Sequence, residues 1–226
     1  MDRWNWDRIA AAMGFTFVAL FVAAFIVFGD GPKLGDSPEE VASYFVDDRS
    51  RIVVGLILFG LATIAFAWFV GAIATTLRNA GEVRLGATAI GAGSAVIGIA
   101  LVIFGLNAAQ VIGIAEADPD ASRTVNIIGW AFEVTISWPV AAFTLATAVG
   151  AMRAGIFPQW LSWASLAGAV VLALGGTTLA ESGFWAADGE FTFITIIVFL
   201  VWMLAASWAF MQRVTAEAPR PAAAAA

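Results

Sequence analysis

The chain has 226 residues, of which 61% are hydrophobic and only 12% are charged, and its formal net charge is −6. Soluble domains average roughly 45–50% apolar and about 25% charged residues, so this composition is typical of a membrane protein. The negative charge argues against a nucleic-acid partner, because neutralising phosphates needs clustered Lys and Arg. The chain contains no His and no Cys. Haem ligation by His or Cys, iron–sulfur clusters, blue-copper sites and Cys/His zinc sites are therefore excluded, as are Ser–His and Cys–His catalytic pairs, and we expect no cofactor.

Six apolar stretches, each of at least 20 residues, dominate the sequence. A membrane-spanning helix needs about 20 mostly apolar residues, and in lipid a single segment satisfies its own backbone only as a helix. We therefore predict an all-α polytopic membrane protein, a six-transmembrane-helix bundle that forms one domain over residues 1–213. The predicted spans are Ile9–Phe28, Ile52–Leu77, Leu85–Ala108, Val125–Met152, Pro158–Ala180 and Phe191–Met211.

The first stretch is longer than the roughly 7–15 apolar residues of a secretory signal, so we expect it to be a retained helix. In the loop that follows, Ser37-Pro38-Glu39-Glu40 has the pattern of a helix N-cap, a proline at the first helical position and a capping-box acid. Apolar side chains then recur on one face. This predicts a short amphipathic helix that lies on the outer membrane surface or caps the bundle, either as a cover for helix ends or as a ligand lid.

Basic residues predict the orientation of the spans. Seven Lys or Arg residues flank one side of the predicted membrane and four flank the other. The richer side is expected to be cytoplasmic, which places both termini inside. Twelve of the acidic residues then fall on the outer side. Beyond the last span, residues 214–226 are rich in Ala and Pro and are expected to form a disordered tail.

Glu133 is the one charged residue that lies clearly inside a predicted span. An ionised carboxylate there would cost roughly 2.5–3.5 kcal/mol, the figure for Asp at a helix centre on insertion scales. No Lys or Arg stands at a matching depth, so Glu133 is expected to face the bundle interior in its protonated form or to lie beside water. Farther along, Pro139 predicts a kink, because it cannot donate a hydrogen bond to the carbonyl of Thr135.

Other polar residues are predicted to lie near the level of Glu133, toward the outer face. One hypothesis is a polar vestibule floored by this carboxyl group. The alternative is structural: polar residues gather at helix ends in any membrane protein, and a protonated Glu can hydrogen-bond across helices. The candidate ligand- or ion-binding residues of the vestibule are Glu133, Asn107, Gln110, Ser137 and Thr195.

Gly91, Gly98 and Gly105 recur every seven residues along the third span. Small residues let helix backbones approach closely in a membrane, so this spacing predicts a helix-packing groove. The local sequence does not fit a dinucleotide-binding loop.

Two stretches carry a resemblance to a known family: Ile64–Gly71 with Leu77-Arg78, and Arg153–Leu161. Over most of Ser37–Arg213 the chain resembles a group of uncharacterised bacterial integral membrane proteins with six helices, a domain of unknown function. The resemblance implies the bacterial plasma membrane as location and an outer helix near Pro38–Val46. It implies no established activity and brings no site residue.

Three functions remain open at this point. The leading interpretation is a non-enzymatic accessory or scaffolding component of the membrane that packs through its glycines, with the lipid bilayer and a homo-oligomer or another membrane protein as partners. The first alternative is a small proton- or cation-coupled carrier that uses Glu133. The second is an intramembrane carboxylate enzyme, for which Glu133, Glu181 and Asp188 are the only candidates for acid–base work, and nothing in the sequence pairs them.

Overall fold

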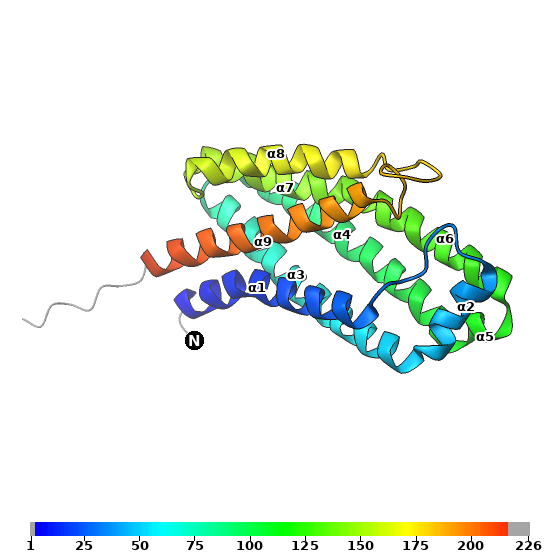
Figure 1. The fold of residues 1–226 in the computed structure, drawn as a ribbon. Coiled ribbons are helices and arrows are strands. Elements are labelled where there is room, and N and C mark those ends of the chain that lie inside the picture. The colour runs from blue at the N-terminus through cyan, green and yellow to red at the C-terminus, as the bar shows by residue number, and fades with distance from the viewer. Residues whose placement is uncertain (1–2, 217–226) are drawn as a thin grey trace, which may run out of the picture.

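The computed structural model describes residues 3–216, and all its long elements are α-helices (Figure 1). Within those residues the only β-type pairing is an isolated bridge between Ala180 and Ala186. Five helical segments are long and apolar enough to cross a membrane. The predicted all-α membrane bundle is therefore confirmed. Its helices are α1 (Arg3–Phe28), α2 (Pro38–Asp47), α3 (Arg49–Asn79), α4 (Val83–Ala109), the π-helix η1 (Gln110–Ile114), α5 (Ala115–Ala117), α6 (Pro119–Thr135), α7 (Ser137–Arg153), α8 (Gln159–Gly175) and α9 (Glu190–Ala216).

Six of these helices form a closed ring in the order α1, α3, α4, α7, α8 and α9, with α9 packed back against α1. Aromatic side chains fill the middle of the ring. The ring of Phe143 meets Phe66 edge-on at 5.5 Å between centroids and Trp202 at 5.7 Å. Edge-to-face pairs of this kind stabilise by about 0.5–1.5 kcal/mol beyond the area they bury. The centre of the bundle is therefore a packed core at this level.

The fourth predicted span consists of two helices, with Ile136 between α6 and α7. The predicted effect of Pro139 explains the interruption, because α6 ends at Thr135, the residue whose carbonyl loses its donor. The span also starts earlier than predicted. Asp118 accepts hydrogen bonds from the amides of Asp120 and Ala121 at 3.0 and 3.1 Å and caps α6 ahead of Pro119. This is a second N-cap and proline pattern, and the sequence prediction had missed it.

The fifth predicted span, Pro158–Ala180, is too long. α8 has 17 residues and ends at Gly175. At 1.5 Å per residue it is about 25 Å long, close to the minimum for a span. Gly175 and Gly176 let the side chains of Ser137 and Trp138 approach closely where a longer helix would continue. In the turns that follow, the Trp185 indole N–H donates to the carbonyl of Thr177 at 2.8 Å.

The predicted capping box of α2 is confirmed. The amide of Glu40 donates to Ser37 Oγ at 3.3 Å, and the amide of Ser37 donates to Glu40 Oε2 at 2.8 Å. The apolar face of α2 packs on protein, so α2 caps the bundle. This second, smaller core consists of Val41, Ala42, Phe45, Ile52, Leu56, Val111 and Ala115.

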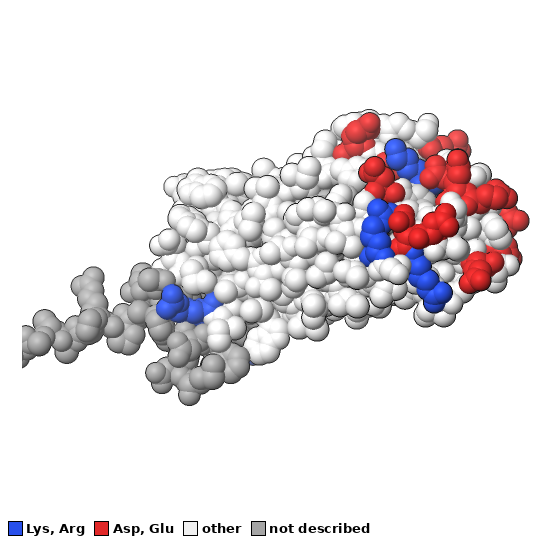
Figure 2. All heavy atoms as spheres, turned by 60° about the horizontal axis from the view of Figure 1, so that its bottom comes forward, with Lys and Arg blue, Asp and Glu red and all other residues white. Residues whose placement is uncertain are grey.

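The charged residues divide the molecule into two unlike ends. One, here called the acidic end, comprises the segments at residues 29–51, 110–124 and 176–190, and Figure 2 shows Asp and Glu side chains gathered there with Lys and Arg among them. At the other end, Arg153 Nε donates to Glu82 Oε1 at 2.8 Å and ties α7 to the α3–α4 turn. At the C-terminus, α9 continues to Ala216, so residues 214–216, which the sequence predicts as tail, are helical; the remaining tail lies outside the described residues.

Candidate functional site

Glu133 lies at the edge of the helical ring. Its neighbour one turn along, Ser137, packs at the last residue of α8: a Cβ on Gly175 would lie 3.0 Å from Ser137 Oγ. Glu133, on the other side of that turn, is therefore beyond the end of α8. It is also 20 residues from Arg153 at the opposite end. At 1.5 Å per residue this is about 30 Å, the thickness of the hydrocarbon core.

The side chain of Glu133 is partly exposed and makes no hydrogen bond or ion pair with another described residue. A carboxyl group at the edge of the apolar layer would cost far less to insert than one at a helix centre. The predicted depth of Glu133 in the membrane therefore stays a prediction.

Ser137 and Thr195 come together across α8. Both side chains are buried, and a Cβ on Gly175 would lie 2.8 Å from Thr195 Cγ2 as well as close to Ser137 Oγ. The hydroxyl of Thr195 donates to the carbonyl of Thr192 on its own helix at 2.7 Å. Three helices therefore meet here through small side chains. The contact is a packing junction of α7, α8 and α9.

Gln110 and Asn107 belong to a different part of the fold. The amide of Asn107 donates to the carbonyl of Ile103 one turn back at 2.9 Å. Gln110, the first residue of η1, is buried and its Nε2 donates to the carbonyl of Ser122 at 2.8 Å, which fastens η1 to α6. Gln110 Oε1 and Ser122 Oγ are buried without a partner in the described structure, as is Nδ2 of Asn126, one turn after Ser122 on α6.

The candidate residues thus fall into separate groups. Hydrogen bonds or close packing link Gln110 with Ser122 and Ser137 with Thr195, and within residues 3–216 no hydrogen bond joins the two groups or includes Glu133. The vestibule hypothesis stays a prediction. The sequence does not predict the contact of Ser122 with Gln110, because that contact depends on the π-helix η1, and no residue pattern predicts a π-helix here.

The loop at residues 29–37 is fastened across the acidic end. The Trp130 indole N–H donates to the carbonyl of Pro32 at 3.1 Å, Arg123 Nε donates to the carbonyl of Asp36 at 3.1 Å, and the amide of Leu34 donates to Asp188 Oδ2 at 3.0 Å. These bonds tie the loop to α6 and to the segment before α9. They also place Asp188 in a loop contact, while Glu181 is exposed. No group of three or more described carboxylates is placed to hold a metal ion.

The helix α4 has two different glycine faces. On the inner face, a Cβ on Gly93 would lie 2.6 Å from Val70 Cγ1, and one on Gly86 would lie 2.9 Å from the carbonyl oxygen of Ala74. These glycines bring α4 against α3. The predicted packing residues Gly91, Gly98 and Gly105 lie on the other face, where all three are exposed and a Cβ would meet nothing within 4 Å. None of the helices within residues 3–216 occupies the predicted groove.

Comparison of the chain with protein-family models, with curated proteins and with solved structures gives no match. The resemblance to uncharacterised six-helix bacterial membrane proteins therefore stays an expectation.

Proposed function

We propose that this protein is a non-enzymatic scaffolding component of a membrane, and that it associates through the outward glycine face of α4, defined by Gly91, Gly98 and Gly105. One observation carries the proposal: the three glycines stand free of every other described residue on the least buried of the five long spans. Exposed glycines leave a strip of backbone open to lipid. Close backbone approach is what drives helices together in membranes.

A second copy of the same chain fits this face best. Two identical faces related by a two-fold axis along the membrane normal place glycine opposite glycine, so the contact is self-complementary. Each backbone then gains dispersion and Cα–H···O contacts that a larger residue would prevent. The inner face of α4 already packs in this way, where Gly93 meets Val70. A helix of a different membrane protein is the competing partner.

The test is cross-linking of single-cysteine variants, which the absence of natural cysteine makes free of background. Ser94, exposed between Gly91 and Gly98, is changed to Cys and the protein is oxidised in its native membrane. A disulfide-linked dimer is expected, and adding Gly98→Leu should abolish it. The matched control Gly71→Leu, at an exposed glycine of α3 with an equally empty surround, should leave the dimer intact.

Two outcomes count against the second copy. A Ser94→Cys protein that stays monomeric contradicts self-association, and a cross-link to a different membrane protein identifies the competing partner. A dimer that persists in Gly98→Leu shows that another face carries the contact.

We further propose a bacterial plasma membrane as the location, with both termini in the cytoplasm and the acidic end outside. The distribution of Lys and Arg supports this orientation. Cysteines introduced at Asp47 of the acidic end and at Asn79 of the opposite end, both exposed, distinguish the two orientations in intact cells. A membrane-impermeant maleimide should label Asp47→Cys only. Labelling of Asn79→Cys alone would reverse the topology.

A further inference from the structure

The helices α1 and α9 touch near one end and separate toward the acidic end (Figure 1). They are held together where Gly14 of α1 faces Ser207 of α9, since a Cβ on Gly14 would run into Ser207 Oγ. Farther along, the contacting residues are Phe and Ile instead of Gly and Ser. There the ring centroids of Phe17 and Phe199 are 6.0 Å apart, and those of Phe25 and Phe193 are 6.3 Å apart.

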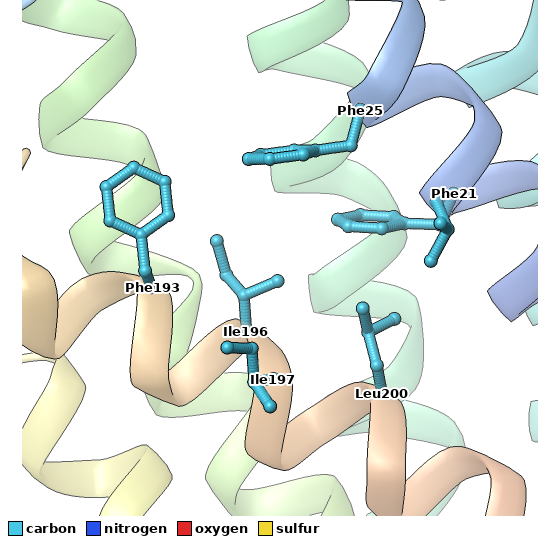
Figure 3. Close-up of a pocket in the computed structure, with 7 residues that line it drawn as sticks. Phe21, Phe25, Phe193, Ile196, Ile197 and Leu200 are labelled. Carbon is cyan, nitrogen blue, oxygen red and sulfur yellow. The ribbon is translucent and has the colours of Figure 1, made fainter. Parts of the chain in front are cut away.

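A groove lies where α1 and α9 separate. It has a volume of about 150 Å³. In Figure 3, Phe21 and Phe25 point from α1 toward α9, and Phe193, Ile196 and Leu200 face them from the other side. All the lining residues are apolar: Phe21, Val22, Phe25, Phe193, Ile196, Ile197 and Leu200.

The groove opens sideways, toward the surface that faces lipid. Of its lining residues, Phe25 is 47% exposed and Ile197 is 59% exposed. Along α9 it runs from Phe193 to Leu200, about 10 Å at 1.5 Å per residue, or a third of the hydrocarbon core. The groove is smaller than sites for drug-sized ligands, which usually measure about 300–1,000 Å³. Its length and its apolar lining fit one stretch of a single acyl chain.

Charged residues of both signs lie near the acidic-end termini of α1 and α9, the two helices that line the groove. Glu190 is one turn before Phe193 on the same face of α9, and Asp30 follows the end of α1. Neither forms an ion pair with a described Lys or Arg. The amide of Leu34 donates to Asp188, which joins the loop after α1 to the segment before α9, and the exposed Lys33 and Glu190 are each within two residues of this bond.

We propose that the α1–α9 groove binds a phospholipid with a zwitterionic amino headgroup, from the leaflet at the acidic end. The acyl chain lies between Phe25 and Phe193. The ammonium group meets Glu190 and Asp30, and the phosphate meets Lys33. This binding is independent of the α4 face, and either can fail without the other.

The first experiment locates the acyl chain. The full chain is reconstituted in nanodiscs with a phosphatidylethanolamine that carries a photoreactive group on its acyl chain, and cross-linked peptides are mapped by mass spectrometry. Labelling should concentrate on the lining residues of α1 and α9. Ile197→Trp, which fills the groove, should reduce that labelling severalfold.

The matched control is Val201→Trp, on the same helix and equally exposed at 60%, but outside the groove lining. It should leave the labelling unchanged. A label spread evenly over all lipid-facing helices overturns the proposal, as does a label that Ile197→Trp and Val201→Trp reduce equally. A circular dichroism spectrum and a melting curve for each variant separate loss of binding from loss of fold.

The second experiment tests the headgroup. Phosphatidylethanolamine and phosphatidylglycerol with the same photoreactive chain compete for the protein, and the amino lipid should label the groove severalfold more. The double change Asp30→Asn and Glu190→Gln should abolish this preference but retain labelling, while Glu181→Gln, an exposed acid elsewhere at the acidic end, should keep it. Equal labelling by the two lipids in the unaltered protein would overturn the headgroup assignment.

Discussion

Gly93 of α4 lies against Val70 of α3 so closely that a Cβ on the glycine would stand 2.6 Å from Val70 Cγ1. We expect Gly93→Ala to destabilise the fold by about 1–3 kcal/mol, because α3 and α4 have to move apart or Val70 has to leave its rotamer. Gly98→Ala, on the outward face of the same helix, should leave the stability of the monomer unchanged or slightly higher. Unfolding in mixed detergent micelles, followed by circular dichroism, measures both.

The comparison contains its own control, since both substitutions add one methyl group to one helix. Equal stability for the two variants would mean that α4 does not pack on α3 as described. If only Gly98→Ala lowered the stability, the face of α4 that packs on α3 would be the face of Gly98 and not that of Gly93.

The capping box of α2 predicts a response to pH. Hydrogen bonds from the backbone amide of Ser37, and then from its side chain, lower the pKa of Glu40 below its usual value. A group whose pKa is lowered in the folded state stabilises it above the ordinary Glu pKa of about 4.3, and the contribution is lost as pH falls through the lowered value. α2 should therefore lose order in acid.

A carbon-13 NMR titration of the Glu40 carboxyl group measures this pKa directly. Ser37→Ala should bring it back toward the ordinary value and destabilise the helix start by about 0.5–2 kcal/mol. A midpoint that Ser37→Ala does not move would show that the capping box does not form in solution.

Tyr44 holds α2 against the end of α1, since its hydroxyl donates to the carbonyl of Phe28 at 2.9 Å. Burial raises the pKa of Tyr44 above its usual value near 10, although Arg51 beside the ring opposes the shift. The neutral phenol is therefore favoured in the folded state. Its contribution is complete below pH 10 and is lost as pH rises through the raised value.

This is the chain's only tyrosine, so an ultraviolet absorbance titration reports Tyr44 alone. The midpoint should lie above that of the denatured protein. Tyr44→Phe should cost about 0.5–1.5 kcal/mol, the net value of one hydrogen bond. Coincident midpoints in the folded and denatured protein would show that α2 is not packed on the bundle.

Local chemistry explains what the sequence could predict. Span lengths follow from the thickness of the bilayer, the start of α2 follows from Ser37 and Pro38, and the interruption of the fourth span follows from Pro139. Each depends on residues within one or two turns of the effect, so no knowledge of the neighbouring helices is needed.

The remaining features depend on which helices become neighbours. Gly91 and Gly93 are two residues apart and equally small, yet only Gly93 faces α3. The end of α8 at Gly175 depends on Ser137 and Thr195, which reach it from other helices. The groove between α1 and α9 needs both the Gly14–Ser207 contact and the bulky pairs beyond it, and nothing in either helix alone indicates that they pair.

The position of Glu133 can be tested with two introduced cysteines one helical turn apart. Glu133 is partly exposed beyond the end of α8, whereas Ser137 is 8% exposed and packs at Gly175. Glu133→Cys should react severalfold faster with a water-soluble maleimide than Ser137→Cys, because water reaches the edge of the apolar layer and not the packed junction. Slow labelling at both positions would place Glu133 in a dry core, where its carboxyl group would need a partner or a bound proton. Fast labelling at both would instead show a hydrated path past Ser137, the polar vestibule that a Glu133-dependent carrier requires.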